Sequence, residues 1–371
     1  MSKILIISLQ FPPEIGGAGV VSWQAAKSLA DLGHEVTVVT KLENVEALGS
    51  KLEKFSLIGV KTHKIIRPYE LWFQLKARLA AFDLIILGDA AASVFGALCL
   101  PQRVLDRTAV YLHGQEVPEI LERPSLKARL AKYPRKYLNL LENCKSIIAV
   151  SQSMKSDILS AVPNRFIKNK TEVIYNGYDS AVFCEQSSDA RDKLDIPIDA
   201  QVLVSASRIV KRKGYSAMLD VFTKLIDEGG NYYWIVIGDG NYLDDMKRRV
   251  TGSSLEPFVR FIGAVTQKEM PYYYCAANVF WLLTEYKESL GNVYFEANAC
   301  GLPTIGPRQG GVVESIQENV TGYLVDSTEE CYKILHDKRY KNLRSSLFLK
   351  HLEKFNAYES WKNSKIIKLI D

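Results

Sequence analysis

The chain has 371 residues, more than one ordinary domain needs and enough for two domains with separate cores. Hydrophobic residues make up 47% of it and charged residues 24%, which excludes an intrinsically disordered protein. The net charge of +5 suits a protein that handles anions. The basic residues are dispersed and form no known nucleic-acid-binding motif, so we expect no nucleic-acid partner.

The cysteines and the apolar segments indicate where the protein works. The six cysteines are far apart and include no C-x-x-C pair, which predicts free thiols in a reducing compartment. The apolar start, MSKILIISLQF, lacks the features of a signal peptide and predicts a first strand. No run approaches the ~20 apolar residues of a membrane span. We therefore expect a cytoplasmic protein, at most peripheral to the inner face of the membrane.

The first half of the chain alternates apolar strands with helices. The run Lys3–Leu9 is continuously apolar, as in a strand buried on both faces of a parallel sheet. A glycine-rich turn follows and opens a helix that we expect to end near Leu32, with Gly33 as its C-cap. Further strands are predicted at His34–Thr40, Leu84–Leu87, Ala109–Leu112 and Ile147–Val150.

The alternation then stops and restarts. Residues 180–200 are polar and contain no predicted strand, as is typical of an interdomain linker. Two successive β-α series predict an α/β protein of two Rossmann-like, doubly wound domains with a crevice between them. The predicted strands of the second series are Val202–Ala206, Tyr233–Ile237, Val259–Ile262, Val279–Leu283 and, last, Thr304–Gly306; its main helices are Tyr215–Glu228 and Gly291–Cys300.

These patterns place the domain boundaries. We assign residues 1–180 to an N-terminal domain and residues 181–355 to a C-terminal domain. Residues 356–371 are predicted to form a C-terminal helix that packs back on the N-terminal domain.

The densest chemical signal is the stretch at residues 284–316. Glu288 and Glu296 enclose seven residues at the point where the chain enters a predicted helix. The amides of a helix's first turn attract anions, and Gly291 lets a phosphate approach the backbone. Glu288, just before this turn, is suited to accept hydrogen bonds from sugar hydroxyls. Glu296, about two turns further along, could do the same for a ribose. An isolated pair of this kind is more often solvated, but Gly310 and Gly311 add a second loop of amides.

Other candidate residues follow predicted strands. Arg208 and Lys213 in SASRIVKRKG place two cations where a leaving diphosphate needs them, although KRKG alone also describes a basic surface turn. His113 follows the strand at Ala109–Leu112, where a histidine faces the crevice. No Asp-x-Asp and no His/Cys cluster has the spacing of metal ligands, so no metal site is expected.

Together these motifs resemble the retaining glycosyltransferases of the GT-B fold, the family of sucrose synthases and phosphatidylinositol mannosyltransferases. The resemblance covers nearly the whole chain and implies two domains that face each other across a cleft, the N-terminal one on the acceptor side and the C-terminal one binding the nucleotide-sugar. It implies that Glu288 contacts the donor sugar, Glu296 holds the ribose, Arg208 and Lys213 bind the diphosphate, and His113 lies beside the donor sugar. The remaining donor contacts that it implies are Gly16, Gly17, Gly238, Val265, Leu290, Gly291, Asn292 and Val293.

The resemblance predicts the reaction. The expected enzyme is a retaining, metal-independent hexosyltransferase that needs no cofactor and moves a sugar from a UDP- or GDP-sugar to a hydroxyl acceptor, in glycan, polysaccharide or glycolipid biosynthesis. Both motif glutamates are assigned to hydroxyl recognition, which leaves no evident nucleophile and favours attack on the face that the diphosphate leaves. The family often has Phe where this chain has Leu290, an apolar exchange that affects packing more than chemistry.

Residues 121–145 carry five basic side chains among leucines and tyrosines and predict an amphipathic helix, interrupted at Pro134. Such a helix is more often merely solvated, but it also suits anionic lipid headgroups and a lipid-linked acceptor. Trp72 and Phe73 would extend this patch. The basic residues are Lys127, Arg129, Lys132, Arg135 and Lys136.

Three other functions remain open. A sugar-nucleotide 2-epimerase of the same fold would act on the donor without an acceptor. A catalytically silent GT-B partner subunit normally loses a charged position, and none is lost here. A nicotinamide oxidoreductase is disfavoured because Ser22 stands where the last glycine of G-x-G-x-x-G belongs.

Overall fold

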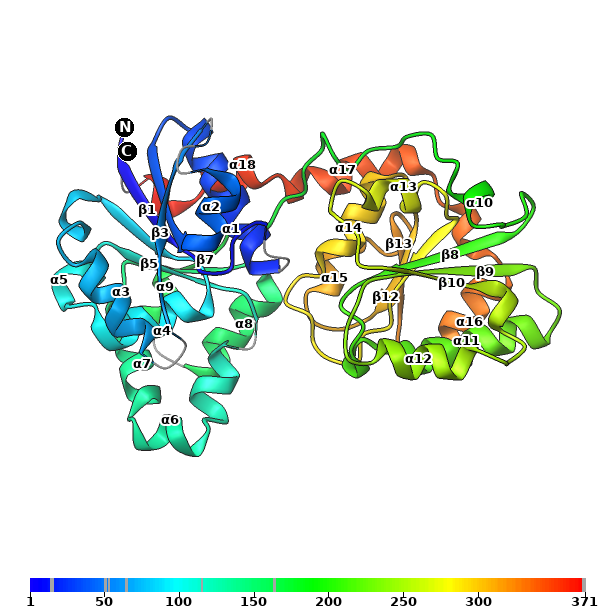
Figure 1. The fold of residues 1–371 in the computed structure, drawn as a ribbon, viewed down its shortest axis with the longest axis horizontal. Helices are drawn as coiled ribbons and strands as arrows, with labels where there is room; N and C mark the ends of the chain where they lie inside the picture. Colours follow the sequence, from blue (N-terminus) through cyan, green and yellow to red (C-terminus); the bar gives the residue numbers. More distant parts are fainter. Residues whose placement is uncertain are drawn as a thin grey trace. The chain divides into compact units, whose positions relative to one another are not determined.

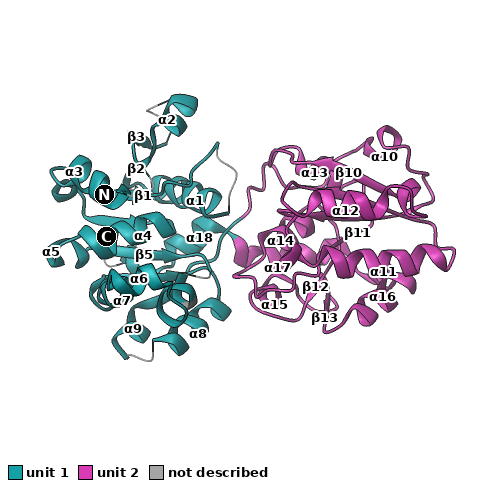
Figure 2. Cartoon of the chain, turned by 60° about the horizontal axis from the view of Figure 1, so that its bottom comes forward, with its two compact units in different colours: residues 1–177, 356–371 teal, residues 178–355 magenta. Residues whose placement is uncertain are grey.

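The computed structural model describes residues 1–13, 17–49, 52, 54–63, 66–114, 116–162 and 165–368 (Figure 1). The chain divides into two compact units, one formed by Met1–Gly177 with Asn356–Asp371 and the other by Tyr178–Phe355. Figure 2 colours the first unit teal and the second magenta. Each unit is built on a parallel sheet, as in Rossmann-like domains.

In the described part of the first unit, seven parallel strands run in the order β3-β2-β1-β4-β5-β6-β7. Strands β4, β5 and β6 consist entirely of buried residues, as expected where helices cover both faces of a sheet. The strands are β1 (Lys3–Ile7), β2 (Glu35–Lys41), β3 (Ser56–Val60), β4 (Leu84–Leu87), β5 (Thr108–Leu112), β6 (Ser146–Ala149) and β7 (Thr171–Val173). The helices are α1 (Gly17–Asp31), α2 (Leu42–Leu48), α3 (Arg67–Leu75), α4 (Ala90–Cys99), α5 (Gln102–Leu105), α6 (Leu126–Leu130), α7 (Tyr133–Asn143), α8 (Gln152–Ala161) and α9 (Arg165–Lys170).

The end of the chain belongs to the first unit. Where the sequence predicted one helix, the structure has two short ones, α18 (Ala357–Lys362) and α19 (Lys365–Lys368). The carboxylate of Glu172 on β7 caps the second of them, accepting hydrogen bonds from the backbone N–H groups of Lys365 at 2.7 Å and Ile366 at 3.1 Å. This cap explains why a new helix begins there.

Six parallel strands form the described sheet of the second unit, in the order β10-β9-β8-β11-β12-β13. Its core contains Trp234 and Trp281, both fully buried, with ring centroids 4.9 Å apart. The strands are β8 (Gln201–Ala206), β9 (Tyr232–Ile237), β10 (Val259–Gly263), β11 (Val279–Trp281), β12 (Thr304–Pro307) and β13 (Gly322–Val325). The helices are α10 (Ala190–Lys193), α11 (Tyr215–Asp227), α12 (Leu243–Val250), α13 (Met270–Tyr274), α14 (Asn292–Ala299), α15 (Val312–Ser315), α16 (Thr328–His336) and α17 (Phe348–Leu352).

Every predicted strand coincides with an observed one within two residues, but β3, β7 and β13 were missed, and Thr304–Gly306 was wrongly taken as the last strand. Glycines weaken the pattern of two of the missed strands, and packing requires both glycines. A Cβ on Gly322 would lie 2.0 Å from the carbonyl oxygen of Thr304, and one on Gly59 would lie 2.7 Å from Cδ1 of Leu42. Strand β7 has three residues, too few to show a period.

The predicted break in the basic amphipathic segment is at a different place. Helix α6 ends at Leu130 and α7 begins at Tyr133, with Lys132 between them at a φ of +52°. Pro134 lies in the first turn of α7, where its missing N–H group breaks no helical hydrogen bond. The predicted interruption therefore exists but lies at residues 131–132, and Pro134 belongs to the first turn of the second helix.

Each sheet has a switch point at which the strand order reverses. It lies between β1 and β4 in the first unit and between β8 and β11 in the second. Ligands of doubly wound sheets bind outside the carboxyl ends of the strands at such a point. The loops that follow these four strands are therefore the places where a ligand is expected.

Candidate active site

The two loops at the switch point of the second unit are joined through their backbones. The N–H group of Glu285, after β11, donates to the carbonyl oxygen of Arg212, after β8, at 2.9 Å. Gly214 has a φ of +78°, and a Cβ there would lie 1.8 Å from the carbonyl oxygen of Leu283. Glycine is therefore required for the two loops to come this close, and it sets the position of the lysine before it.

That lysine forms a shielded ion pair across the two loops. Lys213 Nζ lies 2.5 Å from Oε1 of Glu288, and the two side chains are 13% and 11% exposed. The hydroxyl of Tyr286 donates to the other carboxylate oxygen, Oε2, at 2.8 Å. Burial, followed by the charge of Glu288, raises the pKa of Tyr286, so this hydroxyl stays protonated. Both oxygens of the carboxylate are thus engaged, and the ammonium group is held at the switch point.

A second cation lies on the same loop. Arg208 is exposed, whereas the next residue, Ile209, is fully buried. The backbone of Ile209 donates one hydrogen bond to the loop after β9 and accepts another from it. Burial is the main effect that raises the pKa of Tyr286, and the positive charge of Arg208 lowers that pKa in part. A Cβ on Gly238 would lie 1.9 Å from the carbonyl oxygen of Ser207. Gly238 therefore lets the loop after β9 approach the arginine-bearing loop.

The loop after β11 leads into α14 and is locked to the loop after β12. Gly311 N–H donates to the carbonyl oxygen of Glu288 at 2.8 Å, and the Ser315 hydroxyl donates to that of Leu290 at 2.6 Å. Gly291, the residue before α14, has a φ of +83°. The first amides of any α-helix have no acceptor within it, and the positive end of its dipole lies there. The N-terminal end of α14, at Asn292, can therefore attract an anion.

Glu296 lies further along α14 and is buried, with 8% of its surface exposed. Burial raises its pKa to about 7, because a carboxylate loses hydration there. A carboxyl group in such a place is costly to ionise until hydrogen-bond donors reach it. The environment therefore suits a carboxylate whose missing hydrogen-bond donors are the hydroxyl groups of a bound ligand.

In the first unit, His113 follows β5. Its Nε2 lies 2.8 Å from the carbonyl oxygen of Gly88, the residue after β4, so Nε2 is assigned the hydrogen, since a carbonyl only accepts. The carboxylate of Glu116 accepts from the N–H groups of His113 and Gly114 at 3.1 and 2.7 Å. The imidazole also lies 4.8 Å from the Tyr111 ring, measured between centroids. These contacts fix the orientation of the histidine.

Asp89, which sequence reasoning missed, shapes the loop after β1. Its carboxylate accepts from the N–H groups of Leu9 at 2.5 Å and Gln10 at 2.8 Å, and it caps α4 by accepting from Ala92 N–H at 2.8 Å. The available signal was an aspartate two residues after the apolar run at Leu84–Leu87, where a strand ends.

Close packing accounts for a glycine that was not among the predicted ligand contacts, Gly19 in the first turn of α1. A Cβ on Gly19 would lie 2.9 Å from the carbonyl oxygen of Gln10, whereas one on Gly17 would meet nothing within 4 Å. Gly16, also predicted as a donor contact, lies outside the described residues. Close packing thus accounts for Gly19, and Gly17 begins α1 without such a constraint.

Comparison with known proteins identifies the family. Residues 15–182 match the profile of Glycosyltransferase Family 4, and residues 186–344 match that of Glycosyl transferases group 1. The chain belongs to the group 1 glycosyltransferases. The predicted family and the glycosyltransferase class are thereby confirmed, and the structural match given next confirms the GT-B fold; retention of configuration stays a prediction.

Relatives and structures agree with this assignment. The glycosyltransferase is 26% identical, over an alignment of 386 residues, to N-acetyl-alpha-D-glucosaminyl L-malate synthase of Bacillus anthracis, covering 98% of this chain and 94% of that protein. A GDP-mannose-dependent phosphatidylinositol monomannoside mannosyltransferase of Mycolicibacterium smegmatis is 31% identical over 137 residues, 35% of this chain and 36% of that protein. The structure of Anabaena HepE with UDP-glucose superposes with a TM-score of 0.79 at 21% identity, covering 100% and 99% of the two chains.

Within the second unit, the glycosyltransferase brings most of the predicted donor residues to one edge of the sheet. Lys213 and Glu288 are in contact. Arg208 and Gly238 lie on loops after neighbouring strands, and Val265 follows β10 on the next strand along. The remaining members, Leu290, Gly291, Asn292, Val293 and Glu296, lie at or in α14. Among the residues that sequence reasoning missed, Tyr286 has a direct role, because it holds the carboxylate of Glu288.

The described ranges contain neither a metal-binding cluster nor a helix that could cross a membrane. No three or more His, Cys, Asp or Glu side chains there are grouped so that they could hold a metal ion. None of the described helices combines the length and the apolar character that a bilayer-crossing helix requires.

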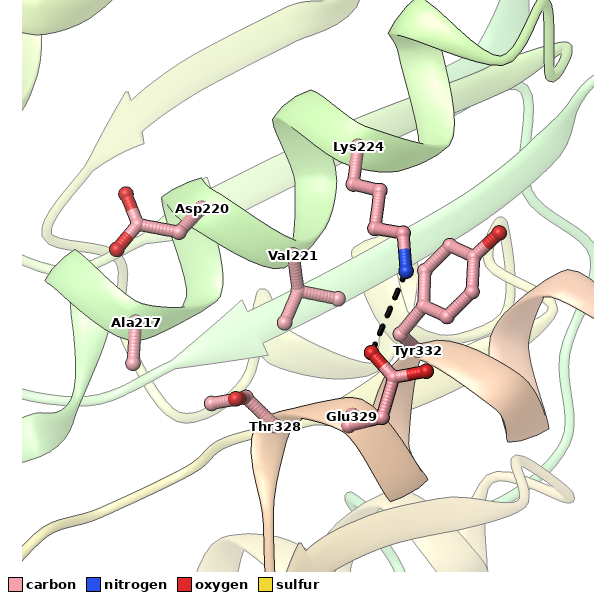
Figure 3. Close-up of a pocket in the computed structure, with 7 residues that line it drawn as sticks. All are labelled: Ala217, Asp220, Val221, Lys224, Thr328, Glu329 and Tyr332. Atoms are coloured by element: carbon pink, nitrogen blue, oxygen red, sulfur yellow. Dashed lines mark hydrogen bonds and ion pairs between the residues drawn. The ribbon is translucent and has the colours of Figure 1, made fainter.

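Another ion pair of the second unit provides a comparison. Helices α11 and α16 border a surface groove of about 270 Å³ (Figure 3). Across it, Lys224 Nζ lies 3.3 Å from Glu329 and 3.7 Å from the centroid of the Tyr332 ring. These two charged side chains are 45% and 57% exposed, far more than the pair at the switch point. An ion pair this exposed contributes little to stability, about 1 kcal/mol or less.

Proposed function

We propose that this glycosyltransferase moves a sugar from a UDP- or GDP-sugar to a hydroxyl acceptor, with retention of configuration and without a metal ion or cofactor. The observation that carries the proposal is the shielded pair of Lys213 and Glu288 at the switch point, next to the positive end of α14. The relatives support it, since one is GDP-mannose-dependent and HepE was solved with UDP-glucose. Glycan or glycolipid biosynthesis is the setting that such donors suggest.

Each residue has a role that its chemistry supports. Arg208 and Lys213 neutralise the diphosphate as it leaves, together with the first amides of α14 at Asn292 and Val293. Glu288 orients the lysine and accepts from hydroxyls of the donor sugar. Glu296 accepts from the ribose. His113, fixed through Gly88, is assigned to the donor sugar.

The same roles favour a one-step reaction. A double displacement needs a carboxylate free to attack the anomeric carbon. Glu288 is engaged through both oxygens and Glu296 is buried. In the proposed step the acceptor oxygen bonds to the anomeric carbon on the face that the diphosphate leaves. The C–O bond to the diphosphate breaks, and the leaving phosphate oxygen takes the acceptor proton, while Arg208 and Lys213 replace a metal ion electrostatically.

The nucleotide that stabilises the fold tests this proposal. We expect UDP or GDP to raise the melting temperature by several degrees, in the presence of a chelator, because a ligand at 100 times its Kd stabilises the folded state by about 2.7 kcal/mol. NAD is not expected to do so. If NAD alone stabilised the protein, or if a chelator abolished both the shift and turnover, the proposal would be wrong.

Products of the preferred donor complete this test. NMR of the glycoside should show the anomeric configuration of the donor, and the intact mass of the enzyme during turnover should show no glycosyl adduct. A covalent adduct would overturn the one-step reaction. Conversion of the donor sugar without any acceptor would instead favour the 2-epimerase.

Part of the first unit supports a lipid-linked acceptor at a membrane surface. Helix α6 buries none of its side chains, and its Leu126 and Leu130 are 73% and 76% exposed. Helix α3 exposes Tyr69 and Phe73, and both α3 and α7 pack on α4. Exposed cations adjoin these apolar groups, as anionic lipid requires. The exposed basic residues of this surface are Lys76, Lys127, Arg129, Lys132, Arg135 and Lys136.

Vesicle sedimentation tests the membrane contact. The protein is expected to pellet with anionic vesicles at low salt and less so at high salt, because salt screens surface charges. The double variant Leu126→Ser, Leu130→Ser should lower the bound fraction at least tenfold, since each buried leucine contributes about 1.5–3 kcal/mol. Leu349→Ser, at a leucine 65% exposed in the other unit, is the matched control. Equal binding by the double variant, or none by the parent, would refute the contact.

A further inference from the structure

The segment between β11 and α14 is held along one edge by the residues that follow β12. Alternate carbonyl groups within residues 284–290 accept hydrogen bonds from residues 309–315. The same edge of the segment therefore faces the residues after β12 along its length. The four bonds run from Gln309 Nε2 to Thr284 at 2.7 Å and to Tyr286 at 3.4 Å, from Gly311 N–H to Glu288 at 2.8 Å, and from the Ser315 hydroxyl to Leu290 at 2.6 Å.

Peptide geometry determines where the N–H groups of this segment point. In a planar trans peptide, the C=O of one residue and the N–H of the next point in opposite directions. The first peptide of the segment shows the result. The carbonyl of Thr284 accepts from Gln309, and the following N–H, that of Glu285, donates to the carbonyl oxygen of Arg212 in the loop after β8. Strands β8 and β12 lie on opposite sides of β11, so an N–H that points away from β12 points to the side of β8.

The last of these peptides lies at the start of α14. Because Ser315 holds the Leu290 carbonyl, the N–H of Gly291 points away from α15, to the side of the loop that carries Lys213. Ser315 is fully buried, and its own carbonyl accepts from His351 Nε2, on α17, at 3.0 Å. The serine is thus fixed in place, and its hydroxyl sets the orientation of the Gly291 amide.

We propose that Ser315 and Gln309 are positioning residues for the donor's diphosphate. Ser315 turns the Gly291 N–H toward the phosphate oxygens, and Gln309 keeps the start of the same segment against the residues after β12. The amide then joins Lys213 in binding the anion without having to reorient, which is how preorganised donors stabilise charge. Both residues act through the peptide groups that they hold and not by touching the substrate. The inference rests on the proposed function, because it takes the diphosphate to bind beside α14.

The test measures the binding of UDP and of uridine to the full chain, or of GDP and guanosine if the parent binds GDP. Ser315→Ala should weaken UDP binding about fivefold, the effect of losing one hydrogen bond. Its affinity for uridine should stay that of the parent, because uridine has no phosphate. Gln309→Met keeps the length of the side chain without its N–H donors and should act in the same direction. Inorganic pyrophosphate should bind to both variants more weakly than to the parent.

Ser188→Ala is the matched control. The Ser188 hydroxyl donates to the carbonyl oxygen of Tyr272 at 2.6 Å, as Ser315 does to Leu290, but in another part of the second unit. This variant should bind UDP and uridine like the parent. The positioning role is wrong if Ser315→Ala binds UDP as tightly as the parent. It is also wrong if the affinities for UDP and uridine fall by the same factor, as a general loss of structure would produce. A parent that binds neither UDP nor GDP instead refutes the proposed function, and this role with it.

Discussion

Replacing Lys213 by alanine is expected to lower the turnover of the glycosyltransferase by about two orders of magnitude while the protein stays folded. Removing one charged donor to a leaving group costs about 3 kcal/mol of transition-state stabilisation. Lys213 qualifies because Glu288 and Gly214 fix it at the switch point, where the ammonium group needs no reorganisation when charge develops. Arg208→Ala, on the same loop, is expected to act in the same direction.

Stability has to be separated from catalysis in this experiment. Without Lys213, the carboxylate of Glu288, 11% exposed, loses its cation, which destabilises the fold. The double variant Lys213→Ala, Glu288→Gln removes the unpaired charge, so it should regain thermal stability but not turnover. Lys224→Ala breaks the exposed pair of Figure 3 and is the matched control, with unchanged kcat/KM and a stability loss of about 1 kcal/mol or less. Near-normal turnover of both Lys213→Ala and Arg208→Ala would contradict the assignment.

The sequence predicted which residues the candidate site contains but not how their side chains are held. Periodicity was enough to find both sheets, because runs such as Leu84–Leu87 are buried on both faces and therefore continuously apolar. The sequence placed Arg208 and Lys213 after one predicted strand and Glu288 after another, and the structure shows that these two strands, β8 and β11, flank the switch point. Strand β13 was missed because Gly322, which the approach of β12 requires, reads as a turn residue.

The supporting residues were beyond sequence reasoning because their partners are distant in the chain. Asp89 holds the backbone of Leu9 across 80 residues. Ser315, on helix α15, holds Leu290 by a hydrogen bond to its carbonyl oxygen. Such contacts depend on the order of strands in the sheet, which no local pattern contains. The burial of Glu296 is hidden for the same reason, since an E-x7-E spacing is compatible with two solvated carboxylates.

Replacing Glu296 by glutamine is expected to stabilise the unliganded protein at pH 8 and to weaken nucleotide binding. The carboxyl has a pKa of about 7 in the folded protein against an ordinary value of 4.5, because burial penalises the charge. Between these two values the folded protein binds more protons than the unfolded chain. Its free energy of unfolding therefore falls as the pH rises from about 4.5 to 7. Above pH 7 the free energy of unfolding has fallen by the full amount, about 3 kcal/mol.

The glutamine variant removes this contribution, because an amide of the same shape does not ionise. Its free energy of unfolding at pH 8 should exceed that of the parent by up to about 3 kcal/mol, and the two should converge toward pH 5. Denaturant unfolding at several pH values measures this difference. Glu329→Gln, at a carboxylate 57% exposed, is the control and should leave the pH dependence unchanged.

Ligand binding should change in the opposite direction. Ribose hydroxyls donate to the ionised carboxylate, so the parent's nucleotide affinity should rise as the pH increases from 6 to 8. The amide has a single acceptor oxygen without charge, and a hydrogen bond to a charged group contributes about 1.5–3 kcal/mol, so Glu296→Gln should bind at least about tenfold more weakly at pH 8. A buried carboxyl with a purely structural role would change stability alone. If Glu296→Gln binds the nucleotide as tightly as the parent, Glu296 is not part of the nucleotide site. Its carboxylate would then destabilise the unliganded protein without contributing to binding.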